Sequence, residues 1–255
     1  MNTNRSLFPA LGIALVIMLA QARGAAAAEI TVLCSNGLKA VVEELVPQFE
    51  RSTGHKAVVT YGLAASFKQR IEGGEPFDVA FVTPTVMDDL IAHGKIAGDT
   101  RATIARTGLA ILVKAGARKR DITTVDAFKR ALLDAKGIAY AKEGASGIAF
   151  AAIVQRLGIA DALKAKSKLT VTGEEVGESV VKGDSEFGIL PVSEILPVKG
   201  AEMLGAFPAD VQSYIVMVGG VSAGARQAVA ARDLIKFLTA PAALPVIKAK
   251  GMERS

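Results

Sequence analysis

Apolar residues along the first half of the chain alternate between two spacings. Short apolar runs rich in β-branched residues, typical of buried parallel strands, cover residues 30–33, 57–61 and 77–82. After each run the apolar residues recur at helical spacing, over residues 38–49, 65–72 and 86–91. Three successive strand–helix units predict a mostly parallel sheet with helices on both faces.

The pattern is interrupted by a long apolar run at residues 104–113 and then starts again. Further strands are expected at residues 137–140, 169–172 and 187–190, and further helices at residues 124–133 and 146–157, with residues 178–181 continuing the alternation. Thr124 is a candidate cap for the first of these helices. A second extended run, residues 211–218, precedes a last helix at residues 226–238.

This order predicts an α/β protein with two doubly wound βα domains, joined by a two-stranded hinge, with a ligand cleft between them. We assign residues 29–108 plus 210–255 to domain I and residues 109–209 to domain II. The hinge is expected near residues 106–109 and 210–214.

The first 28 residues have the features of a cleavable signal peptide. Arg5 precedes an uncharged apolar run at residues 7–19, and Ala26 and Ala28 form a small-residue cleavage site before Glu29. A membrane anchor would need about 20 apolar residues. We therefore expect export and a periplasmic location.

The amino-acid composition argues against several classes of functional site. Cys34 is the single cysteine of the chain, which excludes an intrachain disulfide or a cysteine-based metal cluster. The two histidines, His55 and His93, lie in separate short turns and not at ligand spacing. The net charge of +5 is spread along the chain and only 5% of residues are aromatic, which argues against nucleic-acid binding. We expect no metal, no cofactor and a monomer.

Small residues follow the predicted strands, at the points where helices should begin in the cleft. Backbone N–H groups at a helix start have no partner within the helix and carry a partial positive charge, so several such starts can hold an anion without arginine. The candidate ligand-binding residues are Ser35, Asn36, Gly37, Ala64, Ala65, Ser66, Thr83, Ser146 and Gly147. Taken singly, each loop is also explained as an ordinary helix cap.

From Glu29 onward the chain resembles the type II periplasmic binding proteins, and within them the molybdate-binding subunits of ABC transporters. The likeness is carried by residues 30–32, 49–54, 61–62, 69–71, 77–81, 105–106, 109–113 and 187–189. The resemblance implies hinged closure around a small anion and delivery to an inner-membrane ABC permease.

Three positions depart from the molybdate pattern. Molybdate binders place serines where this chain has Gly37 and Ala64, and a tyrosine where it has Pro191. Hydroxyls stand at neighbouring positions instead, so the pocket is expected to suit either a molybdate-like oxyanion or an organic acid.

The chain also resembles aconitate isomerase, which belongs to the same branch. That resemblance implies an alternative function, the interconversion of cis- and trans-aconitate by an allylic proton shift, which needs a general base and donors for the developing enolate. Candidate proton-transfer residues are Lys142, Glu143 and Glu175, each of which is also explained as a solvated loop charge.

Overall fold

The computed structural model describes residues 27–254; the predicted signal peptide lies outside these residues except for its last two positions. The strands are β1 (Glu29–Ser35), β2 (Lys56–Gly62), β3 (Val79–Val82), β4 (Ala102–Lys114), β5 (Ile138–Ala141), β6 (Ser167–Thr170), β7 (Phe187–Pro191), β8 (Ala201–Ala206) and β9 (Tyr214–Val221). The α-helices are α1 (Lys39–Thr53), α2 (Ala64–Glu72), α3 (Pro84–Ala92), α4 (Val125–Asp134), α5 (Ala145–Arg156), α6 (Ala160–Lys164), α7 (Gly173–Lys182), α8 (Val192–Ile195), α9 (Ala228–Thr239) and α10 (Leu244–Ala249). Four 3-10 turns complete the order: η1 (Asn36–Leu38), η2 (Gly98–Thr100), η3 (Ala209–Val211) and η4 (Pro241–Ala243).

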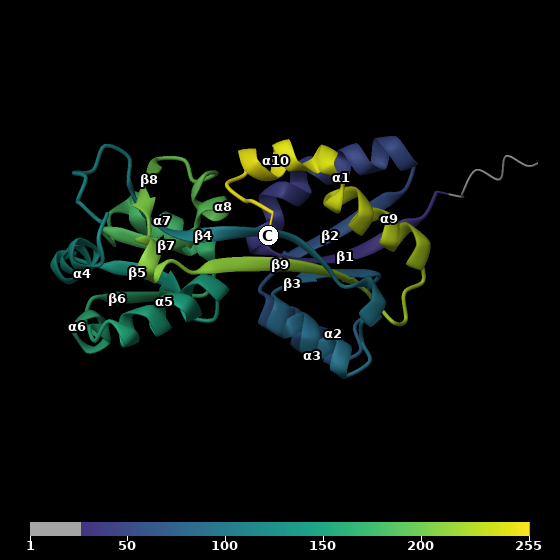
Figure 1. Ribbon diagram of the computed structural model, residues 1–255, viewed down its shortest axis with the longest axis horizontal. Coiled ribbons are helices and arrows are strands. Elements are labelled where there is room, and N and C mark those ends of the chain that lie inside the picture. Colours follow the sequence, from purple (N-terminus) through teal and green to yellow (C-terminus); the bar gives the residue numbers. More distant parts are fainter. Residues whose placement is uncertain (1–26, 255) are drawn as a thin grey trace, which may run out of the picture.

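The first lobe is built on parallel strands, as the sequence predicts. β1 pairs in parallel with both β2 and β3, and β3 pairs antiparallel with β9. In Figure 1, α1, α9 and α10 lie above this sheet and α2 and α3 lie below it. Buried residues fill both faces: Val42, Leu45 and Phe49 of α1 on one side, and Phe67 of α2 with Leu90 of α3 on the other.

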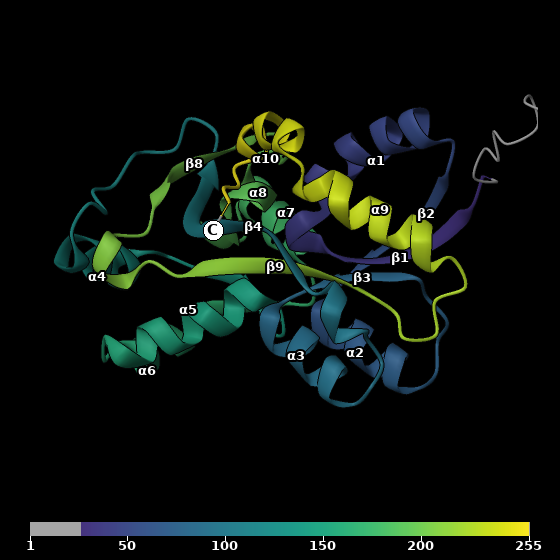
Figure 2. The ribbon, with the colours of Figure 1, turned by 45° about the vertical axis from the view of Figure 1, so that its right-hand side comes forward.

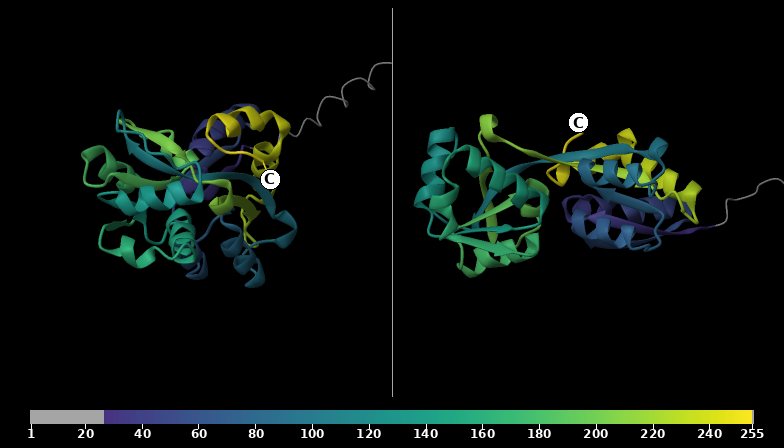
Figure 3. Two further views of the ribbon diagram at one scale, coloured as in Figure 1. Left: turned by 60° about the vertical axis from the view of Figure 1, so that its left-hand side comes forward. Right: turned by 90° about the horizontal axis from the view of Figure 1, so that it is seen from below.

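Two long strands cross from this lobe to the second. β4 pairs with β9 through Gly108 and, from Leu109 onward, with β7 and β8. The change of partners falls inside the predicted hinge, and the view from below shows two lobes joined by these strands (Figure 3). On the return crossing the structure differs from prediction, because η3 turns the chain and β9 begins only at Tyr214.

The second lobe repeats the arrangement, again with two parallel strand pairs. β5 pairs in parallel with β6 and β7, and one continuous path orders the sheet β2-β1-β3-β9-β4-β7-β5-β6, with β8 beside β4. Figure 2 shows α5 and α6 below this part of the sheet and α7 and α8 behind β4. The Thr124 hydroxyl accepts a hydrogen bond from the Ala127 N–H, so the predicted cap of α4 is made.

The predicted α/β architecture is therefore observed, although β8 and the short helices α6, α8 and α10 were not predicted. Residues 201–206 contain Gly205 and do not alternate regularly between apolar and polar side chains. The sequence pattern therefore did not predict the strand that pairs with β4. Across residues 27–254, the longest apolar helices fall short of what a membrane crossing requires.

Candidate functional site

A cavity of about 120 Å³ lies between the two lobes. Its walls come from η1, α2 and α3 of the first lobe, from α5, α7 and α8 of the second, and from Ile215 and Met217 of β9. Ligand pockets for drug-sized molecules measure roughly 300–1,000 Å³. This cavity therefore suits a much smaller molecule.

Three helices begin at the cavity wall without a side-chain cap. Leu63 precedes α2, Thr83 precedes α3 and Gly144 precedes α5, and none of these residues makes a capping hydrogen bond. Pro84 at the start of α3 has no N–H to satisfy. The remaining first-turn N–H groups are free to bind an anion, and each helix dipole adds partial positive charge at the same point.

Hydroxyl groups stand among these helix starts. Ser35 is 5% exposed, and its Oγ has no hydrogen-bond partner within residues 27–254. Ser146 is equally buried at the start of α5, and Thr83 lines the cavity beside α3. A buried hydroxyl without a partner costs free energy in the folded protein, so Ser35 is suited to donate to a ligand.

Most of the ligand-binding residues that the sequence predicts line this one cavity. They are Ser35, Asn36, Gly37, Ala64, Ala65, Thr83 and Ser146. Ser66 and Gly147 do not line it. Ser66 is exposed on α2, and Gly147 faces the end of β5, where a Cβ would overlap the Ala141 carbonyl oxygen.

The candidate proton-transfer residues are separated by the structure. Glu143 lines the cavity, whereas Lys142 and Glu175 do not. The Glu175 carboxylate accepts a hydrogen bond from the Val171 N–H, and its own N–H donates to the Thr172 hydroxyl. Thr172 thus caps α7, and Glu175 stabilises the start of this helix, a role that its position three residues after a threonine could have indicated.

Apolar groups occupy the positions where the sequence departs from the molybdate pattern. Gly37, Ala64 and Pro191 all line the cavity. Leu63, Val86, Ile148, Ile215 and Met217 extend this apolar part of the wall. The cavity therefore offers hydrogen-bond donors on one part of its surface and hydrocarbon on the rest.

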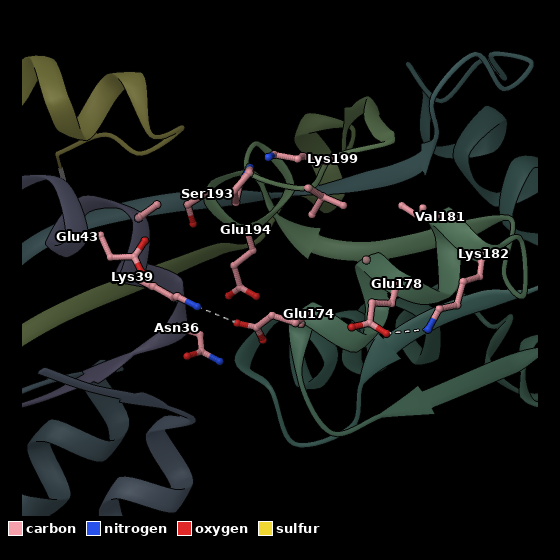
Figure 4. Close-up of a pocket in the computed structure, with 15 residues that line it drawn as sticks. Asn36, Lys39, Glu43, Glu174, Glu178, Val181, Lys182, Ser193, Glu194 and Lys199 are labelled. Atoms are coloured by element: carbon pink, nitrogen blue, oxygen red, sulfur yellow. Dashed lines mark hydrogen bonds and ion pairs between the residues drawn. The ribbon is translucent and has the colours of Figure 1, made fainter.

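Glu194 of α8 is a site residue that the sequence analysis did not identify. It lines the inner cavity and also an outer chamber of about 490 Å³ between α1 and α7. Loss of solvent and, to a smaller extent, the charge of nearby Glu174 raise the pKa of Glu194 to about 7, against the opposing effect of Lys39. Figure 4 shows the Glu194 carboxyl beside the ion pair that Lys39 and Glu174 form. A single glutamate on a one-turn helix carries no periodic signal in the sequence.

Other reactive groups lie away from the cavity. Cys34 is fully buried in β1, and burial raises the pKa of its thiol, so it is not a poised nucleophile. Glu72, Asp89 and His93 gather on the outer side of α2 and α3 at a spacing that could hold a metal ion. The Lys68 ammonium already pairs with both of these carboxylates, at 2.6 and 3.0 Å.

Comparison with known proteins gives a consistent picture. The family model described as bacterial extracellular solute-binding protein matches residues 30–253. The aconitate isomerase of a Pseudomonas species is 29% identical over 88% of this chain and 87% of its own length. The molybdate-binding protein ModA of Azotobacter vinelandii is 28% identical over 96% of each chain.

Solved structures share the fold. The periplasmic molybdate-binding protein of Azotobacter vinelandii superposes with a TM-score of 0.76 and 21% identity, covering 89% of this chain and 99% of that one. The sulfate-binding protein SubI of Mycobacterium tuberculosis superposes with a TM-score of 0.72 and 18% identity, covering 88% of this chain and 86% of that one.

Proposed function

The chain belongs to the bacterial extracellular solute-binding protein family, and we propose that it captures a small organic carboxylate in the periplasm for an inner-membrane ABC permease. The donor groups at the starts of α2, α3 and α5 would hold the carboxylate oxygens, with the Ser35 and Ser146 hydroxyls. A monomer that closes by rotation at β4 and β9 is sufficient for this function.

The cavity wall has hydrogen-bond donors on one part and hydrocarbon on the rest, and this arrangement favours an organic acid over molybdate as the ligand. Molybdate presents oxygens in all directions, so a site for it needs donors on every side. Here Gly37, Ala64 and Pro191 present no side-chain donor, and Met217 and Ile215 close the wall from β9. A carboxylate with a hydrocarbon backbone would match both parts of this surface.

The names of related proteins point to both an organic carboxylate and a molybdate-like oxyanion. One protein at 29% identity is named an aconitate isomerase, and one at 28% is named a molybdate-binding protein. The apolar wall is the observation that favours the carboxylate.

The test is a ligand screen on the purified mature protein by thermal shift and isothermal titration. Trans-aconitate, cis-aconitate and citrate are compared with molybdate, tungstate and sulfate at equal ionic strength. A ligand at 100 times its dissociation constant should add roughly 2.7 kcal/mol of stability. Binding of a carboxylate with little response to molybdate is expected. Sub-micromolar affinity for molybdate with no carboxylate binding would refute the organic-acid assignment.

An isomerase on the same frame is the second candidate, favoured by the relative named aconitate isomerase and by two acids, Glu143 and Glu194, that line the cavity. A base there would remove a proton from the carbon beside a carboxylate and return a proton at the other end of the allylic system. Incubation with trans-aconitate in heavy water, followed by proton NMR, separates the functions. A carrier gives no conversion, whereas turnover that Glu143→Gln or Glu194→Gln abolishes identifies an enzyme.

A further inference from the structure

Glu194 connects the two chambers of the cleft. It lines both the inner cavity and the outer chamber, and its carboxyl packs against backbone from each lobe. A Cβ on Gly37 of η1 would lie 3.9 Å from Oε1, and a Cβ on Gly173 of α7 would overlap Oε2. The contact at Gly37 is ordinary van der Waals contact, so it is the missing side chain at Gly173 that leaves room for the carboxyl.

Within residues 27–254, the Glu194 carboxyl makes no hydrogen bond to a side chain or to the backbone. The nearest cation, the Lys39 ammonium, pairs with Glu174 at 3.3 Å. Figure 4 shows this ion pair beside Glu194, with no interaction drawn to Glu194 itself. Glu194 is half-buried, and a carboxyl that has lost much of its solvent and has no partner is more stable when protonated.

Charged groups around Glu194 come from three directions. Lys39 and Glu43 of α1 line the outer chamber on one side, and Glu174 of α7 lines the other. Farther along α7, Glu178 and Lys182 pair with each other at 2.8 Å, and Lys199 follows α8. β4 and β8, which also pack against α8, contribute no charged side chain to either chamber.

Among residues 27–254, no lysine, arginine or histidine lines the inner cavity, and its two titratable residues are Glu143 and Glu194. An ionised Glu194 would place a negative charge beside the bound anion with no compensating cation on the wall, and the two charges would repel. A neutral Glu194 instead presents an O–H donor to that anion. The protonation state of this residue therefore decides between attraction and repulsion.

We propose that Glu194 is a ligand-binding residue that holds a proton in the free site and donates it in a hydrogen bond to the captured anion, so that capture weakens as the pH rises through neutrality. This inference rests on the proposed function of anion binding. It adds a physical reason why anion binding at a site without a lining cationic side chain should depend on pH.

The test measures the dissociation constant of trans-aconitate by isothermal titration between pH 6 and pH 8 at constant ionic strength. With a pKa of about 7, the protonated fraction of Glu194 falls about tenfold over this range, and the dissociation constant should rise by about the same factor. Glu194→Gln keeps an N–H donor and cannot ionise. Its affinity should stay near the value of the parent at pH 6 and change little with pH.

Two further variants distinguish Glu194 from its surroundings. Glu174→Gln removes the charge that raises the Glu194 pKa, so the decline in affinity should begin at lower pH. Glu178→Gln, on the same helix but paired with Lys182, should leave the profile unchanged. Equal pH profiles for the parent and Glu194→Gln would overturn the inference and leave the proposed function standing. No binding of any carboxylate by the parent at any pH would overturn both.

Discussion

At the residue scale, the cavity contains a polar atom that folding alone does not explain. Ser35 lies at the carboxyl end of β1, 5% exposed, and its Oγ has no partner within the described chain. By contrast, the buried Ser179 hydroxyl donates to the Ser185 hydroxyl at 3.0 Å. One serine stabilises the fold, and the other is free to bind a ligand.

We therefore expect Ser35→Ala to weaken carboxylate binding by about 1 to 3 kcal/mol, the cost of a lost hydrogen bond to a charged group. The free energy of unfolding of the ligand-free protein should not fall, because the variant removes an unpaired buried hydroxyl. Titration calorimetry and urea unfolding measure the two effects. Ser179→Ala is the control, and it should lower stability while leaving affinity unchanged. Normal affinity in Ser35→Ala would show that this hydroxyl does not contact the ligand.

Some residues that line the cavity were predicted from the sequence, and others were not. Ser35, Thr83 and Ser146 were accessible to prediction because each follows an apolar strand and precedes a helix, and parallel strands present such loops at one edge. Glu194 was not, because its environment is formed by α1 and α7, which are far apart in the sequence. Glu175 lies outside the cavity lining and donates its N–H to Thr172, a contact that the sequence analysis did not consider.

At the element scale, the positions of helix starts depend on close packing against strand ends. Gly147 lies in the first turn of α5, and a Cβ there would overlap the Ala141 carbonyl oxygen of β5. The sequence pattern identified a helix at this place and a small residue within it. It could not show that the glycine is needed for packing, because that depends on the distance between α5 and β5.

Gly147→Ala should consequently destabilise the protein by about 1 to 3 kcal/mol, the usual cost of overpacking. Helix propensity alone predicts the opposite sign, since alanine is favoured over glycine in a helix by roughly 0.5–1 kcal/mol. The steric effect dominates here because the opposing atom is backbone and cannot rotate away. Urea unfolding decides the sign. Gly224→Ala, where a Cβ meets nothing within 4 Å, is the control. A more stable Gly147→Ala variant would show that α5 can shift along β5 at no cost.

At the scale of the whole molecule, two paired strands, β4 and β9, connect the lobes, and a glutamine side chain holds the chain where their pairing ends. β4 and β9 pair from Ala102 to Gly108, and the Gln212 side chain then accepts from the Leu109 N–H at 2.8 Å and donates to the Leu109 carbonyl at 3.1 Å. The sequence predicted the two crossings from the length of two apolar runs. It did not predict this glutamine contact, because hydrogen bonds across 103 residues leave no local pattern. The domain boundaries themselves stay a prediction.

Closure of the lobes should bury apolar surface that the described structure leaves open. Ile148 lines the cavity from α5 and is 59% exposed, and Val86 and Leu63 line the same cavity from the first lobe. If ligand draws the lobes together, small-angle X-ray scattering should show a smaller radius of gyration with trans-aconitate than without it.

Ile148→Ser tests this closure directly, because the side chain gains its contacts only in the closed state. Burying the exposed part of an isoleucine contributes about 1 kcal/mol, so the dissociation constant should rise about fivefold while the stability of the ligand-free protein changes little. Val229→Ser, at a residue 74% exposed on α9 and outside the cavity lining, is the matched control and should leave affinity unchanged. Ligand binding that leaves the radius of gyration and the Ile148→Ser affinity unchanged would mean that the anion enters a preformed cavity. The two crossing strands would then act as a rigid connection and not as a hinge.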